Sequence, residues 1–300
     1  MNGGPSADIF TTAVLTALAM LALYAGTGGM LTLARDGRPG RHRVALTCLA
    51  VGGLVLLAYR WTALSQPVWP PATHVDGLVL VCIALSAVVA ILHHPKRVPG
   101  LGPFALPVIA LLLLWAICAG RWTFSRFNAE TIAMGVHLTS VYVGAIFFCV
   151  AAAAGAGFLH RRASIRRRQA LAAEGVAASL ETLERLLVRT AALGFAFLTI
   201  AVAAGIVAWT SVENDTALAA KLGWKVALSS LVWGIFGLVM SVRVTSALRG
   251  VLAAWMSILG VALLLAAFAL SAQGGTDAPT PEGANGDPLP VAPTHREGPP

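Results

Sequence analysis

The sequence predicts an all-α protein: a polytopic integral membrane bundle of about eight transmembrane helices, with both termini extracytoplasmic. Its composition is the first reason. Hydrophobic residues make up 57% of the 300 residues and charged residues 11%, whereas a soluble domain carries about 25% charged residues. Such a chain cannot cover its apolar surface with polar groups, which excludes an ordinary soluble enzyme. The second reason is that the apolar residues fall into runs of about 20, the length that spans a bilayer.

Helices satisfy their backbone hydrogen bonds within each run, and no run shows the alternating pattern of a membrane barrel. The predicted spans are residues 9–34, 44–62, 75–95, 103–120, 131–159, 189–210, 223–242 and 248–271. No basic segment precedes the first run, so we expect a true span there and not a cleaved signal peptide. Residues 1–272 are therefore predicted to form one transmembrane domain.

Positive charge is concentrated in alternate connections. The first connection contains Arg35, Arg38, Arg41 and Arg43, and five arginines lie between Arg161 and Arg168, whereas residues 63–74 contain no lysine or arginine. Cationic connections stay in the cytoplasm, so the odd-numbered connections are expected there. This placement explains the net charge of +8 without a nucleic-acid partner. The fourth connection, with two arginines of its own, is the exception.

Two segments are predicted to lie outside the bilayer. Residues 160–188 begin with basic residues and then become amphipathic, because Leu180, Leu183 and Leu187 share one helical face. They predict a linker with a short interfacial helix on the cytoplasmic side. Residues 273–300 are rich in proline and glycine and contain no aromatic residue, which predicts a disordered extracytoplasmic tail.

Three positions stand out as candidate ligand-binding sites. His137 lies about two turns inside the fifth predicted span, where an ionisable residue is costly and usually faces the bundle interior. It is either a ligand or relay, or a neutral imidazole bonded to a neighbouring helix. His74, where the third span begins, is either a solvated residue or a ligand. Lys225, beside Trp224, either extends toward the outer interface or meets an anionic ligand there.

The tryptophans and cysteines further limit the kinds of ligand or metal site that the chain is expected to contain. Several tryptophans fall near the outer face and form either an interfacial belt or a platform for a planar ligand such as haem; they are Trp61, Trp69, Trp122, Trp209 and Trp224. The four cysteines lie in apolar runs and lack C-x-x-C spacing, which argues against a zinc site, a redox pair or covalent haem attachment. The chain contains no nucleotide-binding or hydrolase motif.

Residues 131–271 carry three recognisable stretches. The first is VHLTSVYVGAIFFCVAAAAGAGFLHRR, and the second is LETLERLLVRTAALGFAFLTIAVAAGIVAW. The third begins with KLGWKVALSSLVWGIFGLVMSVRV. In order and spacing these stretches resemble the cytochrome c assembly family of haem-handling membrane proteins, which includes CcsA, ResC and CcmC. The likeness is strongest to the shorter HemX-like, or YpjD-like, branch.

The resemblance implies that His137 stands where the family has an outer haem histidine, a possible axial ligand of the iron. It places Trp224 and Lys225 near the end of the family's tryptophan-rich outer loop. Met240 stands where the family has a further histidine, a departure that favours the trimmed branch. The resemblance further implies haem as the cofactor, other cytochrome c maturation membrane proteins as partners, and a bacterial inner membrane as the location.

The expected function is therefore that of a haem-handling assembly factor in cytochrome c-type biogenesis. It would bind or guide haem near the outer face of the membrane and would not be an enzyme. One alternative is a membrane scaffold or regulatory subunit that binds no haem, in which the histidines are structural. Another is a small-solute transporter, although no clear repeat relates the two halves of the chain.

Overall fold

A computed structural model gives the fold of the chain. It describes residues 5–32, 39–64, 74–92, 98, 100–119, 132–166, 179–210, 227, 229–231, 233–234, 236–237 and 249–273. The helices of the described part are α1 (Pro5–Thr32), α2 (Pro39–Leu64), α3 (His74–Leu92), α4 (Gly102–Ala119), α5 (Ile132–Arg166), α6 (Leu180–Thr210) and α8 (Arg249–Gln273). Several positions between residues 227 and 237 are also helical, and this part of the chain contains no strand.

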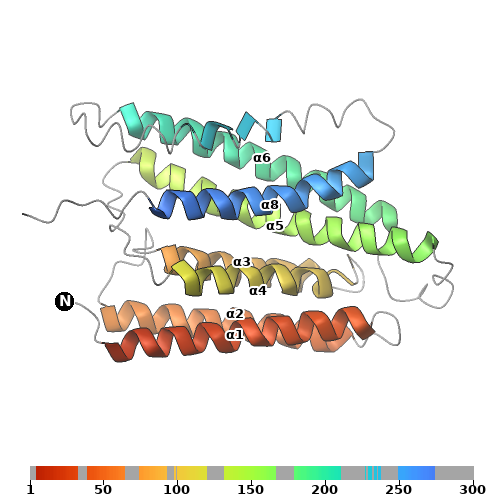
Figure 1. Ribbon diagram of the computed structural model, residues 1–300, viewed down its shortest axis with the longest axis horizontal. Helices are drawn as coiled ribbons and strands as arrows, with labels where there is room; N and C mark the ends of the chain where they lie inside the picture. Colours follow the sequence, from red (N-terminus) through yellow and green to blue (C-terminus); the bar gives the residue numbers. More distant parts are fainter. Residues whose placement is uncertain are drawn as a thin grey trace, which may run out of the picture.

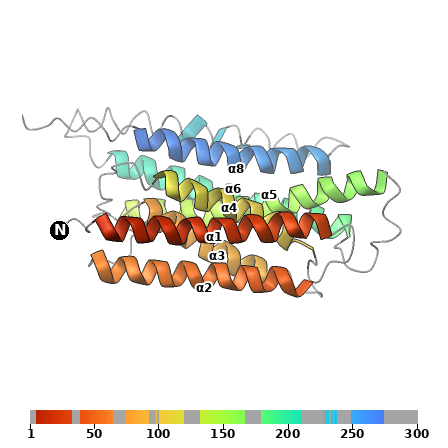
Figure 2. The ribbon, with the colours of Figure 1, turned by 60° about the horizontal axis from the view of Figure 1, so that its bottom comes forward.

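The helices lie with their axes roughly along one direction (Figures 1 and 2). Helices α1 to α4 pack against one another as one group, and α6 and α8 pack with α5 as a second group. Helix α5 joins the groups, because it also contacts α3 and α4. Consecutive helices from α1 to α6 alternate in direction, and the start of α1 lies at the same end of the bundle as the end of α8 (Figure 1).

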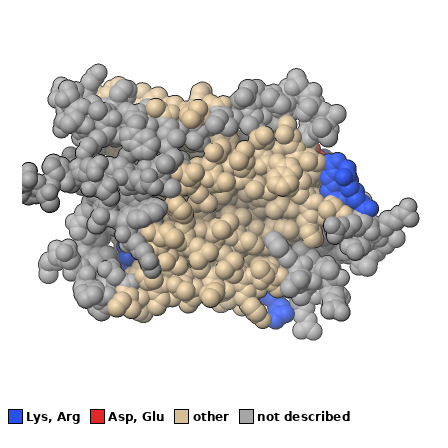
Figure 3. Space-filling view, viewed as in Figure 1, with Lys and Arg blue, Asp and Glu red and all other residues tan. Residues whose placement is uncertain are grey.

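The outer surface of the bundle is apolar. Figure 3 shows a broad face without charged side chains between two ends of the molecule. Large apolar residues that are more than half exposed include Ile9, Met20, Tyr24, Val44, Val51, Val55, Ile91, Leu111 and Trp255. A soluble monomer rarely exposes apolar patches of this extent. Among the described residues, five helices are long and apolar enough to cross a membrane, and α4 and α8 contribute shorter apolar stretches.

Helix α5 forms the centre of the core through small side chains. Its residues from Cys149 to Gly155 are all buried. A Cβ added to Gly155 would lie 3.0 Å from the Cα atom of Ala254 on α8, so glycine allows the two backbones to approach closely. Close approach through small residues is a main source of helix association in lipid, where the hydrophobic effect between helices is weak.

The all-helical membrane architecture is confirmed in its class. The described helices cover seven of the predicted spans, and only the end of α5 and the start of α6 depart from the predicted bounds by more than about five residues, because long apolar runs dictate helix position in lipid. The span predicted at residues 223–242 is described only in part, and the tail at 273–300 lies outside the described residues except for Gln273.

One prediction needs correction at residues 160–188. The described part contains no separate interfacial helix there: α5 continues to Arg166, and α6 begins at Leu180 and runs on without a break to Thr210. Leu183 and Leu187 are 5% and 0% exposed. The amphipathic leucine face continues the buried face of the following span, so these turns join the bundle core instead of lying on the membrane.

Candidate functional site

His137 is held against α6 by a hydrogen bond. Its Nδ1 atom lies 2.7 Å from the backbone carbonyl oxygen of Ala201. Gly205, one turn further along α6, makes room for the ring, because a Cβ there would lie 2.9 Å from the same nitrogen. The carbonyl can only accept a hydrogen bond, so Nδ1 must be the donor. The contact therefore assigns the ring proton to Nδ1.

This tautomer determines the chemistry of the other ring nitrogen. In a neutral imidazole with its proton on Nδ1, Nε2 carries a lone pair that can accept a hydrogen bond or bind a metal. Within the described part of the chain, Nε2 has no hydrogen-bond partner. Histidines that bind metals usually donate their second N–H to a carbonyl or carboxylate, which fixes the orientation of the ring. His137 has this arrangement.

His137 lies at the end of the bundle where α2 and α6 finish and α3 and α5 begin (Figure 1). It is the sixth residue of α5, about 7.5 Å along the helix axis from Ile132, and its side chain is partly buried. The backbone of His74 starts α3 at this same end, and its side chain lies outside what the structure describes.

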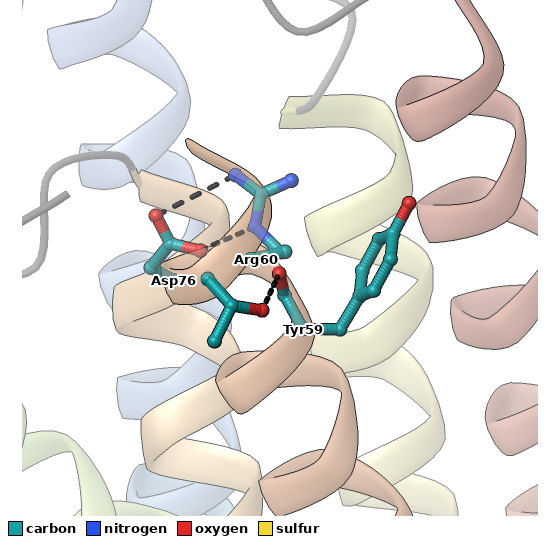
Figure 4. A network of polar contacts seen from close by, with 4 residues as sticks. Tyr59, Arg60 and Asp76 are labelled. Carbon is teal, nitrogen blue, oxygen red and sulfur yellow. Dashed lines mark hydrogen bonds and ion pairs between the residues drawn. The ribbon is translucent and has the colours of Figure 1, made fainter. Parts of the chain in front are cut away.

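A buried ion pair occupies the same end of the bundle, and the sequence reasoning missed it. Arg60, near the end of α2, and Asp76, in the first turn of α3, are joined by a 2.5 Å contact between Nε and Oδ1, with Nη2 3.5 Å from Oδ2 (Figure 4). Their side chains are 10% and 3% exposed. Buried opposite charges stabilise one another only with close geometry, which this two-pronged contact supplies.

Tyr142 connects this ion pair to α5. Its phenol packs directly against Gly77, the residue after Asp76, so closely that a Cβ at Gly77 would collide with the ring. Tyr142 lies five residues after His137 and faces α3, whereas His137 faces α6. This end of α5 is therefore fixed to a neighbour through polar side chains on two of its faces.

A signal for the ion pair was present in the sequence. Arg60 falls within the predicted span 44–62 and Asp76 within 75–95, and only a short connection separates the two spans. Opposite charges placed inside consecutive antiparallel spans, each near the shared connection, are brought to the same depth. An ionisable residue inside a span usually pairs with another polar group, so each charge predicts the other as its partner.

The remaining candidates are only partly described. Trp224 and Lys225 lie outside the described residues, as do Trp69 and Trp122. Trp61 is partly buried and packs against the core. Cys82 and Cys149 are buried and Cys48 and Cys118 exposed, all four with free thiols. Within the described part, no group of three or more histidine, cysteine, aspartate or glutamate residues could hold a metal ion.

Trp233, which follows Trp224 in the predicted span 223–242, contacts α6. Its indole nitrogen donates a hydrogen bond to the hydroxyl oxygen of Thr199 over 2.9 Å. Its ring stacks on Phe195, one turn earlier in α6, with ring centroids 6.0 Å apart. The nearby Phe236 ring packs on Phe148 of α5. The described aromatic side chains of this span, Trp233 and Phe236, thus serve helix packing.

Comparison of the chain with protein-family models, with curated proteins and with solved structures found no match.

Proposed function

We propose that this chain is a haem-handling assembly factor in cytochrome c-type biogenesis, located in a bacterial inner membrane. It would bind or guide haem near the outer face and would not itself turn over a substrate. The observation that supports this proposal best is the hydrogen bond from His137 Nδ1 to the Ala201 carbonyl. That bond orients the ring and leaves Nε2 with the lone pair that an axial ligand needs.

The residues present fit haem through one protein ligand, the imidazole of His137. Haem iron takes a histidine as an axial ligand, and a single imidazole suffices for this, whereas a bare metal ion would need several ligands. When bound, haem would supply a redox-active iron and two anionic propionates. His137 would hold the iron, and the sequence resemblance assigns Trp224 and Lys225 to the ring and the propionates. His74 is a further candidate ligand at the same end of the bundle.

The distribution of arginine supports the proposed orientation. Every described arginine except Arg60 lies in the half of the bundle that contains the end of α5 (Figure 1). Under the positive-inside rule that half faces the cytoplasm. His137 and both termini then lie on the outer side, where haem is needed for cytochrome c maturation in the proposed role.

The same hydrogen bond also favours a second candidate function. An imidazole that donates to Ala201 ties α5 to α6 whether or not Nε2 binds anything. In a haem-free scaffold or regulatory subunit, His137 would serve this purpose alone. The two functions differ in what Nε2 of His137 does, and a suitable pair of substitutions separates them.

The decisive experiment compares His137→Ala with His137→Asn in protein purified from cells supplied with haem. The asparagine amide can donate to the Ala201 carbonyl much as Nδ1 does, but it offers no imidazole nitrogen to iron. For a haem ligand, both variants should lose or shift the Soret band per mole of protein, and both should lower the yield of c-type cytochromes. His160→Ala, on the same helix at the opposite end, is the control and should change neither.

The haem-free function predicts another pattern. His137→Ala should then lower the unfolding temperature, His137→Asn should restore most of it, and neither should change the visible spectrum. A wild-type protein that shows no Soret band after purification with added haem would contradict the haem proposal directly.

A further inference from the structure

Helix α5 is longer than a bilayer requires. Its 35 residues span about 52 Å, against about 30 Å for the hydrocarbon core of a membrane. Gly157 and Phe158 are still buried in the bundle, and a Cβ at Gly157 would lie 3.2 Å from the Phe104 ring of α4 and 3.7 Å from Leu183 of α6. The His160 ring still lies close to the Phe104 ring of α4, with ring centroids 5.5 Å apart, and the C-terminal end of α5 beyond it extends past the other helices (Figure 1). These last two turns cover about 10 Å, which is similar to the depth of the headgroup layer.

This projecting segment, residues 160–166, is strongly basic. It carries Arg161, Arg162 and Arg166, and the described residues provide no carboxylate within ion-pair distance of any of them. At the nearby start of α6, the Glu181 carboxylate is already paired with Arg185, with Nη2 of the arginine 2.5 Å from Oε1 of the glutamate. Among the described residues, the positive charge of these arginines is therefore not compensated.

A second basic group lies at the same end of the bundle. Arg41 and Arg43 are in the first turns of α2, whose main packing partners are α1, α3 and α4. Figure 3 shows basic side chains at separate places toward this end, with surface that carries no charged side chains beside them. A small anion could neutralise only one such group. An extended anionic surface at headgroup depth could neutralise both at once.

We propose that this end of the bundle, with residues 160–166 as its main element, binds the phosphate headgroups of anionic phospholipids. The planar guanidinium group matches phosphate oxygens through paired hydrogen bonds. Each basic residue at an anionic membrane surface strengthens binding about fivefold. The inference depends neither on haem nor on which side of the membrane this end faces.

The test measures lipid binding to the purified full-length protein by native mass spectrometry and by the shift in unfolding temperature. The probes are phosphatidylglycerol and phosphatidylcholine. Wild-type protein should bind phosphatidylglycerol preferentially. The triple variant Arg161→Gln/Arg162→Gln/Arg166→Gln should bind it on the order of a hundredfold more weakly. The matched control, Glu181→Gln/Arg185→Gln, removes an arginine without changing net charge and should stay within about twofold of wild type.

Two further measurements keep the result decisive if the triple variant fails to insert. Raising the salt concentration from about 0.05 to 0.5 M should weaken phosphatidylglycerol binding to the wild type, because exposed charges are screened. The variant with lysine at all three positions keeps the charge and should retain most of the binding. Equal binding of both lipids, insensitivity to salt, or equal losses in the triple variant and its control would each overturn the proposal. A thermal shift from inorganic phosphate as large as that from phosphatidylglycerol would assign the site to a free ion and would also overturn it.

Discussion

Arg60 and Asp76 form the interaction whose loss should cost the bundle most. Removing one member leaves the other charge buried without its partner, which costs about 3–5 kcal/mol. Arg60→Leu and Asp76→Leu should therefore each lower the unfolding temperature strongly. The double variant Arg60→Met/Asp76→Leu removes both charges and should be closer to wild type than either single change. Thermal unfolding in a mild detergent measures all three.

The exposed pair Glu181–Arg185 is the internal control. It has the same 2.5 Å contact, but its side chains are 72% and 67% exposed, and exposed helix pairs contribute about 0.3–0.5 kcal/mol. Arg185→Leu should hardly change stability. Comparable effects in the two pairs would mean that solvent reaches Arg60 and Asp76 and that their burial does not persist in detergent.

At the scale of single residues, the sequence predicted where a polar side chain lies in a span better than which group it contacts. His137 was identifiable because a histidine inside an apolar span is costly wherever it points. Its partner is a backbone carbonyl on α6, which has no sequence signature, and the contact depends on the register between α5 and α6. Arg60 was not identified as a candidate at all. Only the joint positions of Arg60 and Asp76 reveal the pair.

Among the helices, the contact of α5 with α8 depends on a small side chain at Gly155. A Cβ there meets backbone atoms of Ala254, its Cα at 3.0 Å and its carbonyl oxygen at 3.1 Å. Backbone cannot move aside as a side chain can, so Gly155→Ala should force the helices apart and cost about 1–3 kcal/mol. Thermal unfolding, with cross-linking between α5 and α8 as a second measure, tests this.

Gly135, on the same helix, is the matched control. A Cβ there has no atom within 4 Å, so Gly135→Ala should be neutral or stabilise by up to about 1 kcal/mol through reduced backbone entropy. Destabilisation by Gly135→Ala as large as that by Gly155→Ala would show that helix contact is not what distinguishes the two sites.

Sequence patterns placed the helices well because hydropathy alone determines which segments enter lipid. They misplaced the boundary before α6, where charged residues interrupt the apolar composition although Leu183 and Leu187 continue the buried face. The hydropathy of a segment averages over all sides of a helix, whereas packing into the bundle depends on the residues of one face. The boundary between linker and span was for that reason the least predictable part of the fold.

For the molecule as a whole, charge asymmetry predicts the orientation. Reporters fused after residues 38, 98 and 165 should be cytoplasmic, and those after residues 67 and 216 extracytoplasmic, because cationic connections remain inside. Paired alkaline phosphatase and fluorescent protein fusions measure this directly. A cytoplasmic signal at 216 would place the region before Trp224 and Lys225 on the wrong side for the proposed haem site.

The two groups of helices also bear on how the chain assembles during synthesis. Helices α1 to α4 contact one another, so they can complete these mutual contacts before the rest of the chain emerges from the ribosome. Helix α5 cannot do so: its contacts with α6 and α8 require segments made later. Until then, its buried run from Cys149 to Gly155 faces lipid or the insertion machinery, with little side-chain bulk to hold it in place. The second half of the bundle is accordingly the stage at which biogenesis is most easily interrupted, and truncation after α5 should yield a chain that is inserted yet rapidly degraded.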